Sequence, residues 1–305
     1  MPISVGVIGT GWVGSSVAMS VLNAGFASEL LLADARHEVA EGEAMDLAHG
    51  APFYTTTAVR AVRVEEMLDT DAVVVAAGRN GKPGESRLDL LRDNAAALRT
   101  LAQQFSGYKG LFVVVTNPVD VLTYVAAKSS GIPCERVIGT GTMLDTARLR
   151  QVLGRALRVD PHSVHAQVVG EHGDSEVVLW SNAHVGGTPL REWAGWSADH
   201  EAPIATEVRT AAYEIIKRKG ATNHAIGLTT AALLRAALRG ERSVLTVSRV
   251  QTGALDIHDV ALSLPTVVDV DGAVDVISPK MSTAERDALQ RSATVLRDAI
   301  GSLSD

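Results

Sequence analysis

The sequence predicts an α/β protein in which a doubly wound parallel sheet is followed by a region of α+β type. Two patterns lead to this prediction. From residue 3 to about residue 140, short apolar runs alternate with amphipathic segments of helical length, as in βαβ units. After residue 141 the alternation stops, and a long helical stretch precedes antiparallel strand patterns. We therefore expect two domains, residues 1–140 and 141–305, with a cleft between them.

In the first domain, each short apolar run is bounded by turn residues and has the length of a strand. The predicted strands are residues 4–8, 29–33, 72–76, 110–115 and 136–138. The predicted helices are residues 12–24, 37–49, 88–104 and 119–129. Because helices lie between most of the strands, the crossovers should be right-handed and the sheet parallel.

The second domain begins with a predicted helix at residues 144–156 and short strands near 165–169 and 176–180. A helical stretch from about 203 to 239 is interrupted by Gly220. Residues 242–250 and 261–276 have antiparallel strand patterns, with turn residues at Asp271 and Gly272, before a last helix at 283–300. This order indicates a second domain of α+β type.

The composition argues against several classes of function. The 305 residues have a formal net charge of −7 and no Lys/Arg run, so we expect no nucleic-acid partner. The most apolar stretches, 72–77 and 111–115, have the length of strands, so no membrane association is expected. A strand pattern stands where a signal peptide would, and the single Cys134 cannot form an intramolecular disulfide. We expect a cytoplasmic protein.

A glycine-rich turn, Gly9-x-Gly11-x-x-Gly14, closes the first strand and opens the first helix. Such glycines allow a tight turn and the close approach of a pyrophosphate, and the helix N-terminus favours its negative charge. Asp34 follows Gly14 by 20 positions, at the end of the second strand. A carboxylate there accepts hydrogen bonds from ribose hydroxyls and repels a 2′-phosphate. The sequence thus predicts a Rossmann-type domain that binds NAD.

Three residues suited to proton chemistry on an anion lie close together in the sequence. Asp145 and Arg148 are three positions apart, and His172 follows. A buried carboxylate fixes the tautomer of an imidazole and stabilises its protonated form. A guanidinium matches a substrate carboxylate with two parallel hydrogen bonds. Two strand ends, at Gly78 and at Asn117, add groups at the sheet edge where such folds bind ligands.

With these motifs in order, the chain resembles the NAD-dependent L-lactate dehydrogenases of the lactate/malate dehydrogenase family over residues 3–302. The motifs that carry the resemblance are Gly9-x-Gly11-x-x-Gly14, Asp34, Gly84-Glu-Ser-Arg87-Leu-Asp-Leu, Thr116-Asn-Pro-Val-Asp, Leu144-Asp-Thr-Ala-Arg148, Gly170-Glu-His-Gly-Asp and Gly220-Ala-Thr222. The resemblance implies an oxidoreductase that interconverts pyruvate and L-lactate, a reaction linked to glycolysis.

The resemblance also implies a role for each site residue. His172 would exchange the proton, with Asp145 on its other nitrogen, while Arg148 would hold the substrate carboxylate. Arg87, on a loop that closes over the site, would polarise the substrate carbonyl. The remaining substrate-binding residues would be Asn117, Thr222 and Gly81. The cofactor-binding residues would be Gly9, Gly11, Trp12, Val13, Gly14, Asp34, Gly78, Asn117 and Ile226.

Gly81 departs from the family pattern, which has glutamine in lactate enzymes and arginine in malate enzymes at this position of the closing loop. Without a guanidinium there, a second substrate carboxylate would be enclosed without a partner. Malate becomes less favoured, unless Arg79 or Lys82 replaces the missing charge. Glycine also leaves room for a side chain larger than methyl. Pyruvate, a bulkier 2-keto acid and oxaloacetate therefore stay open as substrates.

Arg150 and His165 match positions that form an anion site between subunits in allosteric bacterial lactate dehydrogenases. The resemblance thus implies a homo-oligomer, either a dimer or a tetramer, with fructose 1,6-bisphosphate as a possible ligand. The other histidines have no metal-ligand spacing, so no metal is expected. An alternative of a different class is a non-catalytic NAD-sensing scaffold protein, which NADH oxidation with a 2-keto acid would exclude.

Overall fold

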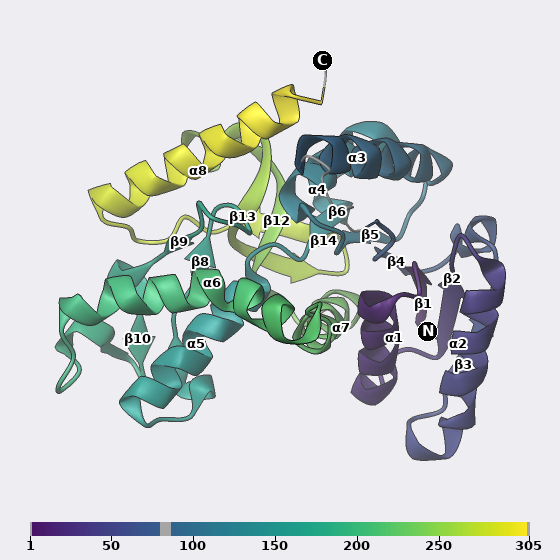
Figure 1. Ribbon diagram of the computed structural model, residues 1–305, viewed down its shortest axis with the longest axis horizontal. Coiled ribbons are helices and arrows are strands. Elements are labelled where there is room, and N and C mark those ends of the chain that lie inside the picture. Colours follow the sequence, from purple (N-terminus) through teal and green to yellow (C-terminus); the bar gives the residue numbers. More distant parts are fainter. Residues whose placement is uncertain (1, 80–86, 304–305) are drawn as a thin grey trace.

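The centre of the fold is one mixed sheet. The computed structural model describes residues 2–79 and 87–303, and all statements on the structure concern these residues. The strands of the sheet are β1 (Ser4–Ile8), β2 (Glu29–Ala33), β3 (Ala58–Ala61), β4 (Ala72–Val75), β5 (Leu111–Val114), β6 (Val137–Gly139), β12 (Ser243–Thr252), β13 (His258–Asp269) and β14 (Gly272–Val276). Their order in the described chain is β14-β13-β12-β6-β5-β4-β1-β2-β3 (Figure 1). Strands β1 to β6 are parallel, which confirms the predicted fold class.

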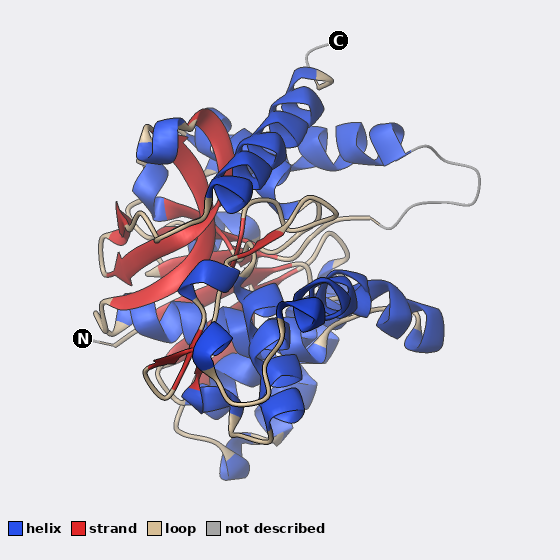
Figure 2. Ribbon diagram, turned by 90° about the vertical axis from the view of Figure 1, so that its left-hand side faces the viewer, coloured by secondary structure: helices blue, strands red, loops and turns tan. Residues whose placement is uncertain are grey.

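Helices cover both faces of the parallel strands (Figures 1 and 2). One face is covered by α1 (Trp12–Ala24), α2 (His37–His49) and α7 (His224–Leu238), and the other by α3 (Arg87–Gln104) and α4 (Val119–Ser130). Successive side chains of a strand point to opposite faces, so Val74 packs under the first group and Val73 under the second.

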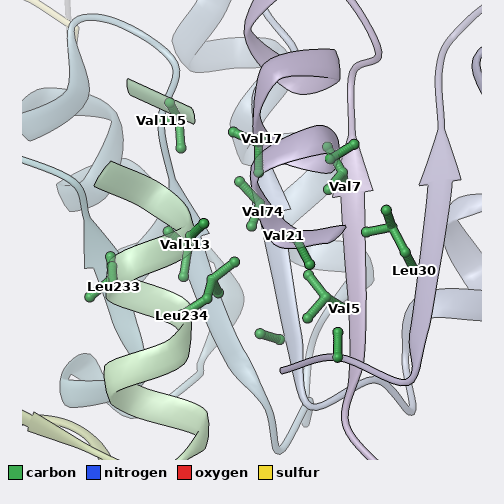
Figure 3. Close-up of a cluster of buried hydrophobic side chains, with 14 of the residues drawn as sticks. Val5, Val7, Val17, Val21, Leu30, Val74, Val113, Val115, Leu233 and Leu234 are labelled. Atoms are coloured by element: carbon green, nitrogen blue, oxygen red, sulfur yellow. The ribbon is translucent and has the colours of Figure 1, made fainter. Parts of the chain in front are cut away.

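Figure 3 shows the core between α1, α7 and the sheet, where Val5, Val7 and Val113 are fully buried. Burial of each such side chain contributes about 1.5–3 kcal/mol, which explains why these strands have continuous apolar runs. The strand ends at which the predicted site residues lie are therefore part of a rigid frame.

The second half of the chain extends the same sheet. Strand β12 pairs antiparallel with β6 where Ser248 lies opposite Gly139. Around this extension lie α5 (Met143–Leu157), α6 (Glu201–Lys219) and α8 (Thr283–Gly301), with short strands β7 (Val164–His165), β8 (Val168–Val169), β9 (Val177–Val178), β10 (His184–Val185) and β11 (Thr188–Pro189). A division at residue 140 stays a prediction, since the sheet runs across it. Among the described residues, none of the helices combines the length and apolar character that crossing a bilayer requires.

Candidate active site

The glycine turn between β1 and α1 has the shape that an anion-binding loop needs. Gly9 has a φ of +92°, which side chains rarely adopt, and a Cβ there would lie 2.6 Å from the main chain of Ala77. A Cβ on Gly14 would lie 1.7 Å from the carbonyl oxygen of Gly9. Around Gly11, by contrast, no described atom lies within 4 Å of where a Cβ would stand. Packing therefore requires glycine at positions 9 and 14. Gly11 has no such contact, so the N-terminus of α1 stays accessible to a ligand.

Asp34 lies directly beside this turn. Its Oδ2 accepts hydrogen bonds from the Thr10 main-chain N–H at 2.9 Å and from the Thr10 hydroxyl at 3.3 Å. Its Oδ1 accepts one from the Arg36 main-chain N–H at 3.1 Å. Partial burial opposes ionisation, but these donors outweigh it and lower the pKa of Asp34. The second strand thus presents an ionised carboxylate next to the open start of α1.

A cavity of about 500 Å³ lies at the carboxyl ends of β4 and β5. The structure brings four predicted site residues to its lining from four separate segments: Val13, Gly78, Asn117 and Thr222. Ligands of open α/β sheets bind at this edge, because the loops that follow neighbouring strands converge there. The cavity therefore joins the glycine turn to the predicted substrate-binding groups.

Several predicted cofactor residues are not among the described lining of the 500 Å³ cavity, and Trp12 and Ile226 are two of them. The Trp12 side chain is 61% exposed and lines another hollow, of about 860 Å³, together with Gly11, Met19 and Leu228. Ile226 is partly buried and packs against the core beneath α1, and it is not among the described residues that line the 500 Å³ cavity. Their roles in cofactor binding stay predictions.

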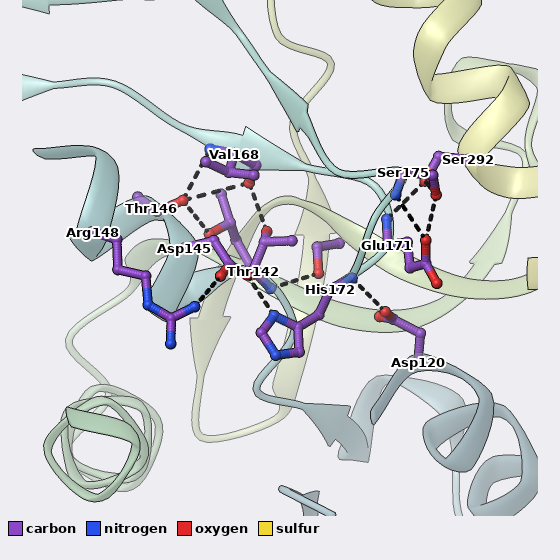
Figure 4. A network of polar contacts seen from close by, with 12 residues as sticks. Asp120, Thr142, Asp145, Thr146, Arg148, Val168, Glu171, His172, Ser175 and Ser292 are labelled. Atoms are coloured by element: carbon purple, nitrogen blue, oxygen red, sulfur yellow. Dashed lines mark hydrogen bonds and ion pairs between the residues drawn. The ribbon is translucent and has the colours of Figure 1, made fainter. Parts of the chain in front are cut away.

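The predicted proton-transfer residues meet at the N-terminus of α5 (Figure 4). Asp145 lies in the first turn of α5, with only 3% of its side chain exposed. Its Oδ2 lies 2.5 Å from Nδ1 of His172, and its Oδ1 accepts a hydrogen bond from Arg148 at 2.7 Å. The side chains of His172 and Arg148 are 23% and 14% exposed. One buried carboxylate thus holds both an imidazole and a guanidinium, each with one side left accessible.

The charges of Asp145, His172 and Arg148 stabilise one another. Burial disfavours the protonated imidazole, but the Asp145 carboxylate more than offsets it and raises the pKa of His172 to about 8. Burial also disfavours an ionised Asp145, yet His172 and Arg148 hold its pKa below the usual value. At neutral pH the ring is therefore protonated beside a carboxylate, and its Nε2 is the nitrogen left for a substrate.

Three consecutive main-chain amides hold the loop that carries His172. Gly170 donates to the carbonyl of Ser263 on β13 at 2.9 Å. The next amide donates to the hydroxyl of Ser292 on α8 at 2.8 Å, and the amide of His172 donates to Oδ2 of Asp120 on α4 at 2.7 Å (Figure 4). Three elements that are distant in the sequence therefore fix the position of the imidazole.

Sequence reasoning missed two buried acids near His172. Asp120 ends the Thr116-Asn-Pro-Val-Asp motif, but its partner is the main-chain N–H of His172, which a sequence does not reveal. Glu176, 5% exposed, immediately precedes β9, and its Oε1 has no hydrogen-bond partner in the described structure. Burial and the Asp145 charge raise the pKa of Glu176 to about 8. The only hint of Glu176 in the sequence was its place two residues after the His172 motif.

Two predicted residues of the closing loop, Gly81 and Arg87, lie within or beside the segment outside the described residues. Gly81 lies outside the described residues, as does Lys82. Arg87 is the first residue of α3, but its side chain is not described. Arg79, just before the gap, pairs with Asp93 through its Nε at 3.1 Å.

Arg150 and His165, the predicted allosteric pair, are not joined by any hydrogen bond or ion pair that the structure describes. Arg150 donates through Nε to the main-chain carbonyl of Ala166 at 3.2 Å, and burial lowers its pKa. It lines a cavity of about 320 Å³ with His162. His165 is exposed on β7 and is not among the described residues of that lining.

Within residues 2–79 and 87–303, no cluster of His, Cys, Asp and Glu is arranged to hold a metal ion.

Comparison with known families adds a match over nearly the whole chain. Residues 3–139 match the family model described as lactate/malate dehydrogenase, NAD binding domain. Residues 142–304 match that of the lactate/malate dehydrogenase alpha/beta C-terminal domain.

Individual relatives are similar over the same length. The L-lactate dehydrogenase of Synechococcus sp. (strain JA-3-3Ab) is 43% identical over 97% of this chain and 98% of its own. That of Salinibacter ruber is 45% identical over 99% and 98%. Among solved structures, the minor L-lactate dehydrogenase of Enterococcus mundtii, in a ligands-bound form, superposes with a TM-score of 0.96 at 40% identity, over 98% of both chains.

Proposed function

Because the chain belongs to the lactate/malate dehydrogenase family, we propose that it reversibly transfers a hydride between NADH and pyruvate, giving L-lactate. NAD is its cofactor. The observation that carries this proposal is the buried Asp145, which contacts His172 at 2.5 Å and Arg148 at 2.7 Å. A proton donor and an anion-binding fork are thereby held side by side, and reduction of a 2-keto acid needs both.

The described residues fit a dinucleotide in three places. The open start of α1 at Gly11 suits a pyrophosphate, because free main-chain N–H groups and the helix dipole favour an anion. The ionised Asp34 suits ribose hydroxyls and disfavours a 2′-phosphate, which supports NAD over NADP. The 500 Å³ cavity at the strand ends has room for a nicotinamide ring beside Asn117. When bound, NADH supplies the hydride to the carbonyl carbon of the substrate.

The chain's own groups supply the proton and orient the substrate. His172 gives the proton on Nε2 to the carbonyl oxygen, and Asp145 stabilises the imidazolium before the transfer. Arg148 holds the substrate carboxylate, and Asn117 donates a hydrogen bond to the reacting oxygen. Arg87 polarises the carbonyl, and Thr222 and Gly81 border the substrate side chain. In the direction of lactate oxidation, neutral His172 accepts the hydroxyl proton.

The test is NADH oxidation with a panel of 2-keto acids. We expect kcat/KM to be highest for pyruvate, compared with 2-ketoisocaproate, phenylpyruvate and oxaloacetate. A preference for one of the first two would move the assignment to a bulkier 2-hydroxy acid, as the glycine at position 81 allows. A preference for oxaloacetate would contradict the inference drawn from Gly81. Cofactor binding without turnover on any of the four would favour the scaffold alternative.

Regulation by fructose 1,6-bisphosphate is a separate part of the proposal. We propose that Arg150 and His165 bind it between subunits, and the partly buried guanidinium of Arg150 supports an anion there. Addition of the sugar bisphosphate should lower KM for pyruvate, and Arg150→Gln should abolish the effect. Arg155→Gln is the matched control, because Arg155 lies on the same helix and pairs with the exposed Glu207. An equal response of the two variants would contradict the assignment.

We also propose that the protein is a cytoplasmic homo-oligomer, a dimer or a tetramer. An exposed apolar surface on α1 and α7 supports this. Trp12, Met19 and Leu228 are 61%, 48% and 64% exposed around the 860 Å³ hollow. Exposed apolar residues that gather in this way mark contact surfaces.

A further inference from the structure

Asp120 is a buried carboxylate to which the proposed reaction gives no role. It is 2% exposed in the first turn of α4, and its Oδ2 accepts the main-chain N–H of His172 at 2.7 Å (Figure 4). Asn117, on the lining of the 500 Å³ cavity, lies three residues earlier, in the segment that follows β5. The hydrogen bond therefore ties the loop that carries His172 to the strand end that carries Asn117.

The surroundings of Asp120 contain few groups that could neutralise it. Its Oδ1 and the Ser248 hydroxyl on β12 are both buried without a partner at bonding distance in the described structure. Glu171, from the His172 loop, adds a like charge. Burial raises the pKa of Asp120 to about 6, against the opposing effects of Ser248 and His172. At neutral pH the carboxylate is therefore ionised, although an isolated buried charge is costly.

A positive charge that acts on this carboxylate is the imidazolium of His172. Asp145 and Asp120 approach that residue from different elements, α5 and α4, one at the ring and one at the main chain. Both charges raise the pKa of His172, while Arg148 opposes them. Asp120 thus has two separable effects on His172, an anchoring hydrogen bond and a negative charge.

We propose that Asp120 is a positioning residue for proton transfer, which anchors the main chain of His172 and whose negative charge stabilises the protonated imidazole. The kinetic part rests on the proposed dehydrogenase function. The electrostatic part concerns only His172 and holds for the protein without substrate.

Two substitutions separate the effects. Asp120→Asn keeps an oxygen that accepts the His172 N–H but removes the charge. Asp120→Ala removes both and leaves a buried N–H without a partner. The matched control is Asp174→Asn, which removes an exposed carboxylate two residues from His172 on the same loop. Exposed charges are screened by water and salt, so this control should have little effect.

The main measurement is the pH dependence of kcat/KM for pyruvate with the full-length protein and NADH. We expect Asp120→Asn to lower the apparent pKa assigned to His172 by about one unit, with kcat at pH 6 nearly unchanged. Asp120→Ala should in addition lose up to about a hundredfold in kcat at every pH, because the imidazole is misplaced. Asp174→Asn should follow the wild type. Equal profiles for Asp120→Asn and Asp174→Asn would overturn the proposal.

A second readout does not depend on turnover. The His172 ring can be titrated by NMR in the cofactor-free protein, with ¹⁵N-labelled histidine and a His172→Gln sample to assign the signal. A downward shift in Asp120→Asn alone supports the proposal even if no 2-keto acid is reduced, whereas an unshifted signal overturns it. If Asp120→Asn does not fold, Asp120→Ala, which also removes the charge, is titrated in its place, and an unshifted His172 signal would contradict the proposal.

Discussion

Asp145 is the residue whose charge matters most in the proposed reaction. Replacement by asparagine should lower the apparent pKa of His172 from about 8 towards its usual value of about 6.5 and reduce kcat by about 10²–10⁴. Steady-state kinetics between pH 6 and 9 would measure both effects. The matched control is Asp160→Asn, because Asp160 contacts His162 at 2.7 Å in an exposed pair. If both variants kept their turnover, the proton-transfer assignment would be wrong.

The Asp145–His172 pair also makes the free energy of unfolding depend on pH. The folded pKa of His172 is raised to about 8, so the contribution of the Asp145–His172 pair is fully present below the unfolded value of about 6.5. It is lost as the pH rises through about 8. Urea unfolding of Asp145→Asn against the wild type should therefore show a larger stability difference at pH 6 than at pH 9.

Glu176 should act against stability at alkaline pH. Its pKa is raised from 4.5 to about 8 in the folded protein, so folding favours the protonated form, and stability falls as the pH rises between these values. Glu176→Gln removes this dependence. At pH 8 the variant should be more stable than the wild type by on the order of 2 kcal/mol, with a smaller gain at pH 5. An equal difference at both pH values, measured by urea unfolding, would contradict this assignment.

Among the elements, the turn between β1 and α1 separates structural from ligand-binding glycines. Gly14→Ala places a methyl group against the carbonyl of Gly9, so we expect a lower melting temperature as well as weaker NADH binding. Gly11→Ala meets no described atom, so its melting temperature should match the wild type while NADH binds at least about tenfold more weakly. Thermal unfolding and NADH fluorescence titration would test the pair. Wild-type NADH affinity in Gly11→Ala would place the pyrophosphate elsewhere.

Elements with a strong local pattern could be predicted from the sequence. The predicted parallel strands agree with β1, β2, β4, β5 and β6 within one or two residues, because each is an apolar run between turn residues. Strand β3 was missed, since Ala58–Ala61 is only partly buried and contains Arg60. The joining of β12 to β6 could not be predicted either, because main-chain hydrogen bonds beside Gly139 make it and no side-chain pattern marks them.

The candidate site was predictable to a similar degree. Side chains with distinctive chemistry, such as Asp145, Arg148 and His172, could be identified by type and spacing. Asp120 and Glu176 could not be assigned roles, because burial and main-chain partners decide those roles. Both depend on how distant segments pack, which a single sequence does not state.

For the whole molecule, the exposed apolar surface on α1 and α7 makes the proposed oligomer testable. Leu228→Asp puts a charge on this surface, so the contact should open and the mass in light scattering should fall, to that of one chain from a dimer or to that of two chains from a tetramer. Val295→Asp is the control, because Val295 is also exposed, at 45%, but lies on α8. A wild-type mass for Leu228→Asp would show that the subunits meet elsewhere.

The three consecutive amides from Gly170 to His172 have a consequence for exchange with solvent deuterium. Their acceptors belong to β13, α8 and α4, so no single helix or strand can move away and release all three. Local opening of one element frees only the amide that it holds, so exchange of all three together requires a larger part of the protein to open. A loop that presents a proton donor should thus have the slow exchange rates of core strands.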